Sequence, residues 1–394
     1  MALPQSERKP ISVLFVAHSG RISGGANRSL LSLMEKLTAN DAVKASVLIP
    51  QENSPLEEAC RALGAQVYTA KYRTCCVIFR REAKDALRLG KLLAEPAMQR
   101  ALAARLDRVL PRDIDLIYTN DRMTAVGAFL AARRGVPHVW HVRAFAKENK
   151  TSYPPRWMAL MARYSSRIVV ISSALEREFM RRSPAGKVCL VHNGIEPGPR
   201  RPREAHGGFN LLLCGRIVPS KGQDDAAAAL ALLKERGIDA QLYFAGELPS
   251  YEDQAYIDRL RDQIRRDGLE DRVHFLGEVS DMPALRARMD AELVCAWCEA
   301  FGRVTVEAMA AGLPVVGTDA GGTKDVLLPG ETGLLYPPRD VRALADALAF
   351  LHDNRAEAAR MGENGPARAA VFSMDNTAKR VNEVIAGALN DAQA

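Results

Sequence analysis

The most informative part of the sequence runs from Glu299 to Asp325 and reads EAFGRVTVEAMAAGLPVVGTDAGGTKD. An apolar, strand-like run ends just before it at Cys295, and a glycine turn then leads into a helix that we expect to begin near Val304. A second strand candidate, Pro314–Gly317, is followed by a Gly-Gly turn and a further helix start. Strands that alternate with helices in this way are typical of a parallel sheet covered by helices. This part of the chain therefore predicts an α/β fold.

The same alternation continues outward through the chain and breaks once in between. Expected strands of the first half are Ile11–Ala17, Ala45–Ile49, Gln66–Thr69, Asp115–Thr119, His138–His141, Arg167–Ile171 and Val188–Val191. Expected strands of the second half are Asn210–Cys214, Gln241–Ala245, Val273–Leu276, Ala291–Cys295, Pro314–Gly317 and Gly333–Leu335. Helical patterns lie between the strands, with the first at Ala26–Leu37 and the last at Asp375–Leu389. The pattern predicts two doubly wound units.

The break is a stretch rich in Pro, Gly and Arg between Glu196 and Gly208, which is typical of an interdomain linker. A length of 394 residues also suits two domains better than one core. We therefore expect Rossmann-like domains at residues 1–198 and 199–372, facing a central cleft. Residues 373–394 are expected to form a helix that crosses back toward the first domain.

The charge of the chain is unevenly distributed. Residues 1–200 hold 32 Lys and Arg against 17 Asp and Glu, a net +15, while residues 201–394 carry a net −8. Two interpretations explain this asymmetry equally well. The first half has either an ordinary basic surface or a surface that faces anionic lipid or an anionic acceptor. The basic residues are not interleaved with aromatic ones as in a nucleic-acid-binding module, so the pattern argues against nucleic acid as a partner.

The sequence shows no apolar run long enough to cross a bilayer and no apolar signal-peptide core at the start. We expect a cytoplasmic protein with reduced thiols, located either free in the cytosol or at the inner face of a membrane. Cys295 and Cys298 form a C-x-x-C pair, but no second pair stands at the spacing of a zinc or redox site.

Two acids and two glycine turns mark the region from Glu299 to Gly322 as a site. The first amides of the helix near Val304 would point at an anion, because a helix N-terminus carries unpaired N–H groups and partial positive charge. Glu307 lies about one turn inside that helix, within reach of hydroxyls beside the anion. Glu299 lies in the turn itself. A plain helix start with one acidic cap would not explain this pattern.

Two further glycine loops follow strand ends. Gly215 to Gly222 reads GRIVPSKG and places Arg216 and Lys221 where they would neutralise a diphosphate. The alternative interpretation is a pair of solvated surface cations. Gly24 and Gly25 precede the first helix, where a simple turn is an equally good interpretation. The G-x-G-x-x-G spacing of a dinucleotide-binding protein is missing there, which argues against an NAD oxidoreductase.

The sequence resembles the family-four retaining glycosyltransferases (glycosyl transferases group 1), which have the GT-B fold. The resemblance rests on two glutamates, Glu299 and Glu307, followed by a small-residue helix, the strand Gly312–Val316 and the turn at Gly321. Elsewhere it rests on Gly215-Arg216 with Lys221-Gly222, Gly24-Gly25-Ala26 and Asn193-Gly194-Ile195. The resemblance spans nearly the whole chain and is vague between Tyr68 and Leu110. Asp325 departs from the usual Glu, so we assign it no role.

The resemblance implies a role for each matching residue. Arg216 and Lys221 would grip the donor diphosphate, assisted by the amides near Arg303 and Val304. Glu307 would bind the ribose hydroxyls. Glu299 and the backbone of Phe301 and Gly302 would hold the transferred sugar. The base would lie against Gly246-Glu247 and Gly277-Glu278-Val279, and His141 would lie near the sugar.

The resemblance further implies a hexosyl transfer from a nucleotide-diphosphate sugar to a glycan, lipid-linked or small-molecule acceptor, as in cell-envelope or exopolysaccharide synthesis. We expect no cofactor and no metal. Asp113 and Asp115 imitate the D-x-D of the other major glycosyltransferase fold, but they lead into a strand, and Asp224-Asp225 begins a helix. The alternatives are a GT-B sugar-nucleotide epimerase and a non-catalytic protein that binds nucleotide sugars or glycans.

Overall fold

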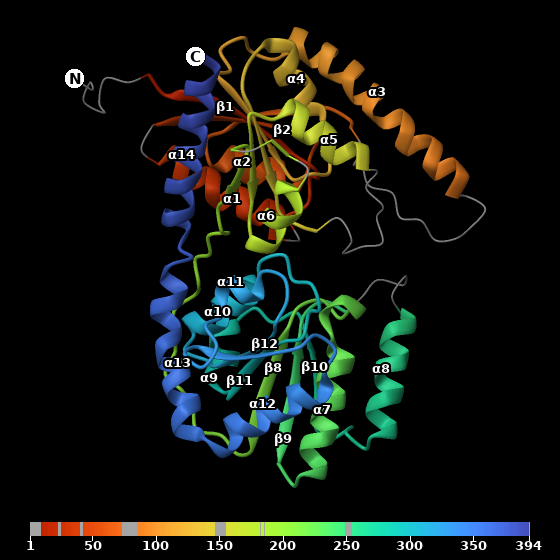
Figure 1. The fold of residues 1–394 in the computed structure, drawn as a ribbon, viewed down its shortest axis with the longest axis vertical. Helices are drawn as coiled ribbons and strands as arrows, with labels where there is room; N and C mark the ends of the chain where they lie inside the picture. The colour runs from red at the N-terminus through yellow and green to blue at the C-terminus, as the bar shows by residue number, and fades with distance from the viewer. Residues whose placement is uncertain are drawn as a thin grey trace. The chain divides into compact units, whose positions relative to one another are not determined.

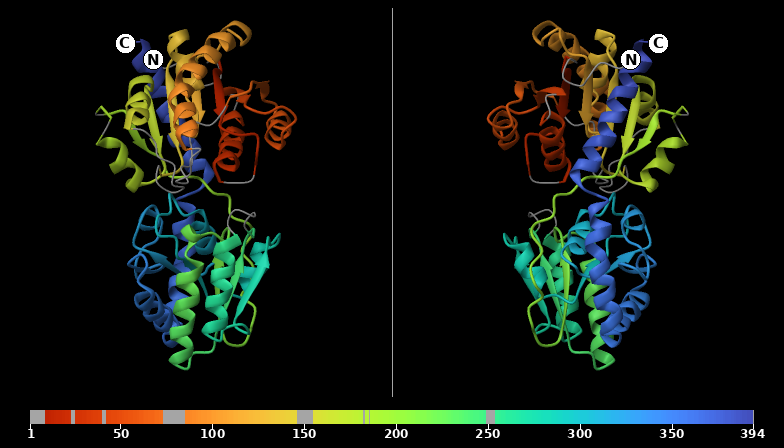
Figure 2. Two further views of the ribbon diagram at one scale, coloured as in Figure 1. Left: turned by 90° about the vertical axis from the view of Figure 1, so that its right-hand side faces the viewer. Right: turned by 90° about the vertical axis from the view of Figure 1, so that its left-hand side faces the viewer.

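The computed structural model describes residues 9–22, 25–39, 42–72, 85–145, 155–181, 183–184, 186–248 and 254–393. The chain forms two compact units. Unit 1 comprises residues 1–194 together with 374–394, and unit 2 comprises residues 195–373. Each unit contains one parallel sheet with helices on both faces (Figures 1 and 2). These two sheets confirm the predicted α/β class.

Unit 1 is built on a seven-stranded sheet in the order β3-β2-β1-β4-β5-β6-β7. The strands are β1 Ile11–Ala17, β2 Val43–Ile49, β3 Gln66–Thr69, β4 Leu116–Asn120, β5 His138–Val142, β6 Arg167–Val170 and β7 Val188–Leu190. The strand order reverses between β1 and β4, so the loops that follow these two strands diverge and leave room for a ligand. Val13 of β1 pairs with Ala45 of β2 on one side and with Leu116 of β4 on the other.

Six helices of unit 1 are described before the linker: α1 Gly25–Thr38, α2 Pro55–Ala62, α3 Asp85–Val109, α4 Val126–Arg134, α5 Pro155–Tyr164 and α6 Ser173–Met180. The start of α2 shows how local sequence fixes such an element. Ser54 accepts a hydrogen bond from the Glu57 amide at 3.3 Å, and Pro55 occupies the first helical position, where no amide is needed.

The last helix, α14 (Met374–Gln393), belongs to unit 1 although it follows all of unit 2 in the sequence. It packs beside α1 (Figure 1). Met374, Val381 and Ile385 join the apolar core that α1 and β1 form. The Thr377 hydroxyl donates to the His192 carbonyl at 2.9 Å. The apolar spacing of α14 therefore closes the core of unit 1.

Unit 2 is built on a six-stranded sheet in the order β10-β9-β8-β11-β12-β13. The strands are β8 Phe209–Cys214, β9 Ala240–Ala245, β10 Val273–Gly277, β11 Ala291–Val294, β12 Val315–Thr318 and β13 Gly333–Tyr336. The order reverses between β8 and β11, the two strands that precede the loops singled out in the sequence.

The helices of unit 2 are α7 Gln223–Glu235, α8 Gln254–Arg266, α9 Met282–Ala287, α10 Arg303–Ala310, α11 Thr323–Val326, α12 Val341–Asp353 and α13 Arg355–Ala370, with a 3₁₀ turn η2 at Pro219–Lys221. Helices α7 and α12 pack together on the core that contains Leu211, Leu213 and Leu293. Because side chains alternate along a strand, Glu292 points away from that core, to the face that carries α10 and α13.

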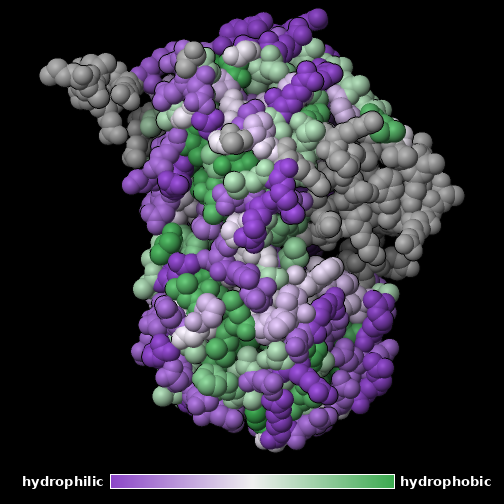
Figure 3. All heavy atoms as spheres, in the orientation of Figure 1, coloured by the Kyte–Doolittle hydropathy of each residue, from purple (hydrophilic) through white to green (hydrophobic). Residues whose placement is uncertain are grey.

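Where the residues are described, every helix is too short or too polar to cross a lipid bilayer. The face drawn in Figure 3 carries mostly hydrophilic side chains, with apolar ones in small separate groups. The larger exposed apolar side chains include Leu93 and Met98 of α3, Trp297 after β11 and Phe350 of α12.

Candidate functional site

The loop after β8 forms one wall of the candidate site in unit 2. Gly215 leaves the sheet with φ +136, and Arg216 next to it is exposed to solvent. The η2 turn then carries Lys221 to Gly222, whose φ of +70 starts α7. A Cβ at Gly222 would lie 2.5 Å from the carbonyl oxygen of Cys295, at the end of β11. Glycine is needed at this position because the two strand-end loops pack backbone against backbone.

The loop after β11 forms the opposite wall and carries Glu299. Its carboxylate Oε2 lies 2.5 Å from Lys221 Nζ, so the structure brings together the first two residues that the sequence marked. Both side chains are partly exposed, at 28% for Lys221 and 21% for Glu299. A charge-assisted pair at the reversal of strand order is well placed to meet an anionic, hydroxyl-bearing ligand.

The Gly-Gly turn after β12 buttresses the Glu299 loop. The Gly322 amide donates to the Glu299 carbonyl at 2.7 Å. A Cβ at Gly321 would lie 2.2 Å from that same carbonyl oxygen, and one at Gly322 would lie 2.5 Å from the Phe301 Cα. The side chain of Phe301 is buried and packs edge-on against Phe372, so this residue faces a ligand with its backbone alone.

Helix α10 begins at Arg303, directly after Gly302, which has φ +95. The first amides of this helix include those of Arg303 and Val304, which the sequence predicted as anion ligands. Thr305 lies in the first turn, and its hydroxyl oxygen is fully buried without a hydrogen-bond partner among the described residues. The buried hydroxyl and the N-terminal amides of the helix are polar groups of the kind that bind phosphate.

Glu307 projects from the same helix and is held by two arginines. Arg286 Nη2 donates to Glu307 Oε2 at 3.3 Å, and Arg303 Nη2 lies 3.8 Å from Oε1. Arg286 also makes two bonds to the fully buried Glu292 of β11, with Nε–Oε2 at 2.8 Å and Nη2–Oε1 at 3.1 Å. The sequence analysis missed Arg286 and Glu292. A charged residue inside the apolar run Ala291–Val294 was the signal that would have revealed them.

Burial alone would lower the pKa of Arg286, but the charges and hydrogen bonds of Glu292 and Glu307 raise it above its ordinary value. The guanidinium therefore stays protonated inside the protein. Burial, and then the nearby Glu292, raise the pKa of the Cys214 thiol at the end of β8 well above its ordinary value. Cys214 is thus a neutral neighbour of the site.

The loops expected to meet the base follow β9 and β10. Gly246 lies directly after β9, where a Cβ would be 2.1 Å from the Gly215 carbonyl oxygen, so β8 and β9 approach closely at their ends. Its amide donates to the Gly277 carbonyl at 2.8 Å. Val279 follows β10 and is half-buried. The loops of Gly215, Gly246 and Gly277 thus lie side by side.

In unit 1, Gly24 lies outside the described residues and Gly25 begins α1. Asn27 in the first turn is buried and braces the preceding loop: its amide donates to the carbonyls of Ser19 at 3.0 Å and Arg21 at 2.7 Å. The Asn120 amide donates to the Ala26 carbonyl at 3.2 Å. The loop after β1 is therefore fixed by asparagines of α1 and β4.

His141 ends up fully buried in β5. Its Nδ1 lies 2.6 Å from the Tyr118 hydroxyl and 3.1 Å from Arg143 Nη2. An arginine can only donate, so Nδ1 accepts and the ring proton resides on Nε2. Nε2 has no partner among the described residues. Burial, and then the charge of Arg143, lower the pKa of His141 well below its ordinary value. His141 is therefore a neutral N–H donor and not a general base at Nδ1.

Arg143 is a second residue that the sequence analysis missed. It is buried, with Nε bonded to Asn120 Oδ1 at 2.6 Å and Nη1 to Asn193 Oδ1 at 2.5 Å. Asn193 belongs to the Asn-Gly-Ile segment that the sequence singled out before the linker. Arg143 thus links the ends of β4 and β5 to that segment and sets the tautomer of His141.

The residues that the sequence analysis considered as metal or redox candidates have structural contacts instead. Within the described residues, no group of three His, Cys, Asp or Glu side chains is arranged as a metal ion requires. Asp115 accepts a hydrogen bond from the Ser12 amide at 2.8 Å, and Asp113 lies 3.7 Å from Lys44 Nζ. Burial raises the pKa of the Cys295 thiol to about 12, so Cys295 is a core residue.

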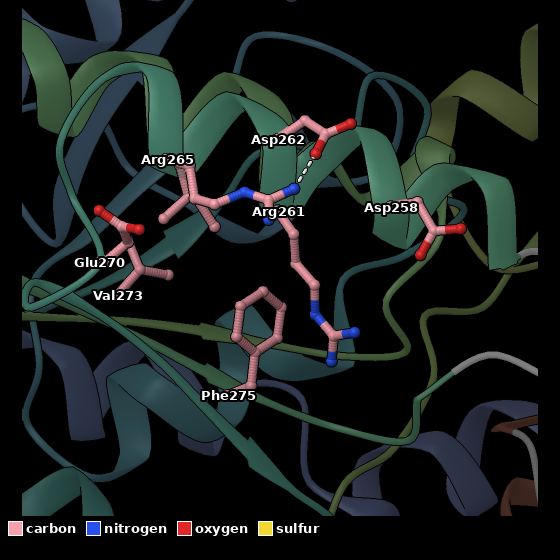
Figure 4. A pocket seen from close by; sticks show the side chains of 8 residues that line it. Asp258, Arg261, Asp262, Arg265, Glu270, Val273 and Phe275 are labelled. Carbon is pink, nitrogen blue, oxygen red and sulfur yellow. Dashed lines mark hydrogen bonds and ion pairs between the residues drawn. The ribbon is translucent and has the colours of Figure 1, made fainter.

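A hollow of about 570 Å³ lies elsewhere, between α8 and the edge strand β10 (Figure 4). Three acids, Asp258, Asp262 and Glu270, line it together with two arginines, Arg261 and Arg265, and Arg265 pairs with Asp262 of its own helix. Arg261 lies beside the Phe275 ring, 5.8 Å from its centroid. Glu270 and Val273 lie at the beginning of β10, whereas ligands of such folds bind at strand C-terminal ends. We do not assign the donor to this hollow.

Two Rossmann-like units with a site at the strand ends define a protein of the GT-B fold. The solved structure of Anabaena Alr3699/HepE in complex with UDP has the same fold, with a TM-score of 0.78 and 23% identity over 96% of this chain and 100% of that one. Residues 23–198 match the model of Glycosyltransferase Family 4, and residues 199–368 match that of Glycosyl transferases group 1. The chain belongs to these family-four, group 1 glycosyltransferases, which confirms the resemblance seen in the sequence.

Curated relatives match over shorter stretches. Glycogen synthase of Mycobacterium tuberculosis (strain CDC 1551 / Oshkosh) is 32% identical over 209 residues, which cover 51% of this chain and 49% of the relative. Phosphatidyl-myo-inositol mannosyltransferase of Mycobacterium leprae (strain TN) is 32% identical over 243 residues, with coverages of 61% and 58%. The chain thus spans about half the length of the curated relatives it matches.

Proposed function

We propose that this protein is a retaining glycosyltransferase that moves a hexose from a nucleotide-diphosphate sugar to a hydroxyl of a glycan, lipid-linked or small-molecule acceptor. Cell-envelope or exopolysaccharide synthesis is the process that such acceptors suggest. One observation carries the proposal: Lys221 Nζ and Glu299 Oε2 meet at 2.5 Å, where the ends of β8 and β11 diverge. The family membership of the chain supports it.

Breaking a glycosyl–phosphate bond builds negative charge on the departing phosphate, and cations already in place stabilise that charge. Arg216, Lys221 and the amides at the start of α10 are the groups that would act on the diphosphate. Glu299 would leave Lys221 in part and accept hydrogen bonds from hydroxyls of the sugar. Glu307 would accept hydrogen bonds from the ribose.

Retention fits a same-face route, in which the acceptor hydroxyl attacks on the side from which the nucleotide leaves. The phosphate oxygen then takes the proton of the acceptor, so no side chain has to act as the base. The neutral His141, with its proton on Nε2, suits a hydrogen-bond donor in unit 1. Two cations and a helix end would neutralise the diphosphate, so we also propose that the reaction needs no metal.

A solved structure with the same fold suggests which nucleobase the sugar donor carries. Anabaena Alr3699/HepE was solved with UDP and with UDP-glucose. We therefore propose a uridine nucleotide sugar as the donor. Thermal-shift measurements with UDP, GDP, ADP and dTDP test this step, and the largest stabilisation is expected with UDP. If only another nucleotide stabilised the protein, the donor would carry that nucleotide's base and the proposal of uridine would be wrong.

The test of the activity is acceptor-dependent release of UDP from UDP-glucose, with the product anomer identified by NMR. Lys221→Ala and Glu299→Ala should each lower kcat/KM by about 100-fold or more, since each removes a group that acts on developing charge or on sugar position. Lys379→Ala, an exposed residue of α14, is the matched control. Unchanged rates in both site variants would show that the site is wrong, and an inverted anomer would exclude retention.

The same preparation separates the two alternatives. An epimerase would convert the sugar of the donor without any acceptor. A non-catalytic binding protein would release no UDP, either with or without an acceptor. Metal independence is tested by adding EDTA, which should leave the rate within about twofold of the untreated enzyme. A rate restored only by a divalent cation would contradict this part of the proposal.

We further propose that the protein works at the cytoplasmic face of a membrane through its basic half. Helix α3 supports this because two of its large apolar side chains are exposed while two of its acids are buried. It buries Glu95 and Asp107 and exposes Leu93 and Met98, at 60% and 51%. Arg105 and Arg108 lie on its exposed side, while Asp107 is paired inward with Arg133 and Arg134. Exposed apolar and cationic groups side by side suit the surface of an anionic bilayer.

A further inference from the structure

A buried arginine connects a charged strand residue with the candidate ribose-binding glutamate. Arg286 of α9 is 7% exposed, Glu292 of β11 is 0% exposed, and Glu307 of α10 is 28% exposed. Arg286 spans the other two through the three hydrogen bonds given above. The three side chains meet on the face of the sheet opposite the α7–α12 core. The chain thus places a cation between one buried and one accessible carboxylate.

The fold does not require charges at these positions. Taking an ion pair out of water costs about as much as the pair returns, and well-packed apolar side chains of similar volume often stabilise a protein equally or better. The neighbours of Glu292 in β11, Ala291 and Leu293, are apolar and fill the core on the other face. The charge of Glu292 makes physical sense if Arg286 must be buried, and a further N–H of Arg286 is bonded to Glu307.

That remaining bond fixes the orientation of Glu307. A glutamate on a helix has three rotatable side-chain bonds, and holding it in one rotamer before the ligand arrives removes an entropy cost from binding. Arg286 is itself rigid, because its planar fork is bonded to Glu292 at two nitrogens. Arg303 is a weaker support, since its Nη2 lies 3.8 Å from Oε1. Oε1 and the second lone pair of Oε2 remain available to hydroxyl donors.

We propose that Arg286, backed by Glu292, is a positioning residue that orients Glu307 for the two ribose hydroxyls of the donor. The inference rests on the proposed function, because it needs a nucleotide whose ribose meets Glu307. It adds a function for a buried ion pair that no part of the sequence pattern marked.

The test compares the affinities of UDP and 2′,3′-dideoxy-UDP by isothermal titration calorimetry. Each hydrogen bond to a charged acceptor is worth about tenfold or more in affinity, and the dideoxy compound loses two, so the wild-type protein should prefer UDP by about 100-fold or more. Glu307→Ala should abolish this preference. The double variant Arg286→Met with Glu292→Met removes the buried pair without leaving an isolated charge, and it should lower the preference at least about threefold.

Affinity for 2′,3′-dideoxy-UDP is the readout that separates positioning from structure. It should stay within about twofold of wild type in the double variant, because the diphosphate and base contacts are untouched. Asp107→Asn is the control for disturbing a buried ion pair elsewhere, in unit 1, and should leave the preference unchanged. Arg286→Lys, made in the wild-type protein, keeps the charge without the fork and should retain part of the preference for UDP.

The outcomes are distinct. A wild-type protein that binds no UDP, or that does not distinguish it from the dideoxy compound, would overturn the ribose part of the proposed function and this inference with it. A wild-type preference that is lost in Glu307→Ala but kept in the double variant would overturn the inference alone. Equal losses for both nucleotides, together with a lower Tm, would reduce Arg286 to a structural residue and overturn it as well.

Discussion

His138 lies inside unit 1 with both ring nitrogens engaged, by the Thr119 hydroxyl at 2.8 Å and by the Ser165 hydroxyl at 3.3 Å. Burial lowers its pKa from 6.5 to about 3. In the unfolded chain the imidazole binds a proton below pH 6.5, whereas in the folded chain it stays neutral down to about pH 3. Stability from this residue is therefore complete above pH 6.5 and is lost as the pH falls toward 3.

We predict that His138→Gln makes unit 1 less sensitive to acid. Each pH unit below 6.5 should lower the free energy of unfolding of the wild-type protein by up to about 1.4 kcal/mol through this residue. The gap between wild type and variant should therefore be larger at pH 7.5 than at pH 5. Urea unfolding measures it through Trp140 and Trp157, which both lie in unit 1, in a Trp297→Phe background. Parallel pH profiles would contradict the prediction.

Single residues also show where the sequence was informative. Glu299, Lys221 and Glu307 could be predicted because they stand next to glycine turns and strand ends, which are visible in sequence. Arg286 and Arg143 were missed because the contacts that tie them to the site, Arg286 with Glu307 and Arg143 with Asn193, join residues 21 and 50 positions apart in the chain. The roles assigned to the predicted site residues remain predictions until the binding and transfer measurements are made.

At the scale of elements, the turn at Gly321 should matter for more than its conformation. Gly321 and Gly330 both have left-handed backbones, with φ of +58 and +76. An added Cβ at Gly330 would meet nothing within 4 Å, whereas at Gly321 it would meet the Glu299 carbonyl at 2.2 Å. We predict that Gly330→Ala costs about 1–2 kcal/mol of stability from strain alone.

Gly321→Ala should cost more than that, and it should also weaken UDP binding, because the Glu299 loop has to move. Calorimetric unfolding and nucleotide titration of the two variants give the comparison. Equal stability losses, with UDP affinity unchanged in both, would show that the close approach of the two loops is unimportant.

Helix α3 gives a prediction on membrane binding. Leu93→Glu with Arg105→Glu should abolish sedimentation with vesicles of phosphatidylglycerol, because it removes both the apolar and the cationic contribution. Met180→Glu with Arg177→Glu makes the same change on α6, where both residues are also exposed, and should leave sedimentation unchanged. Equal binding to neutral phosphatidylcholine vesicles, or equal losses in both variants, would contradict the role of α3.

The elements that the sequence missed share a physical cause. Strands such as β1 and β3 were predicted with their observed bounds because buried parallel strands are continuous apolar runs between turn residues. Helix α3 was not predicted, since it contains Pro96 and exposes Leu93 while burying Glu95, which hides its period. Helix α13 contains Gly365, where an added Cβ would lie 2.4 Å from the Met309 carbonyl. Its glycines, which read as breaks, allow α13 to pack on α10.

At the scale of the whole molecule, unit 1 depends on a helix from the other end of the chain. Ile385 of α14 is fully buried in the core with Val381. We predict that Ile385→Ala destabilises unit 1 by about 2–5 kcal/mol. Asn382→Ala, an exposed change in the same helix, should stay within about 0.5 kcal/mol of wild type. Tryptophan fluorescence in the Trp297→Phe background reports unit 1, and equal stability of the two variants would contradict the prediction.

The position of α14 in the sequence also has a consequence for synthesis. Translation produces all of residues 195–373 before it reaches Met374, so unit 2 has its full complement of strands while unit 1 still lacks its last helix. Until α14 emerges from the ribosome, the apolar surface that later contacts Val381 and Ile385 is open to solvent and to chaperones. A nascent chain halted between Ser373 and the end of α14 would carry a complete second unit and an unfinished first one. Unit 1 can thus be completed only after all of unit 2 has been synthesised.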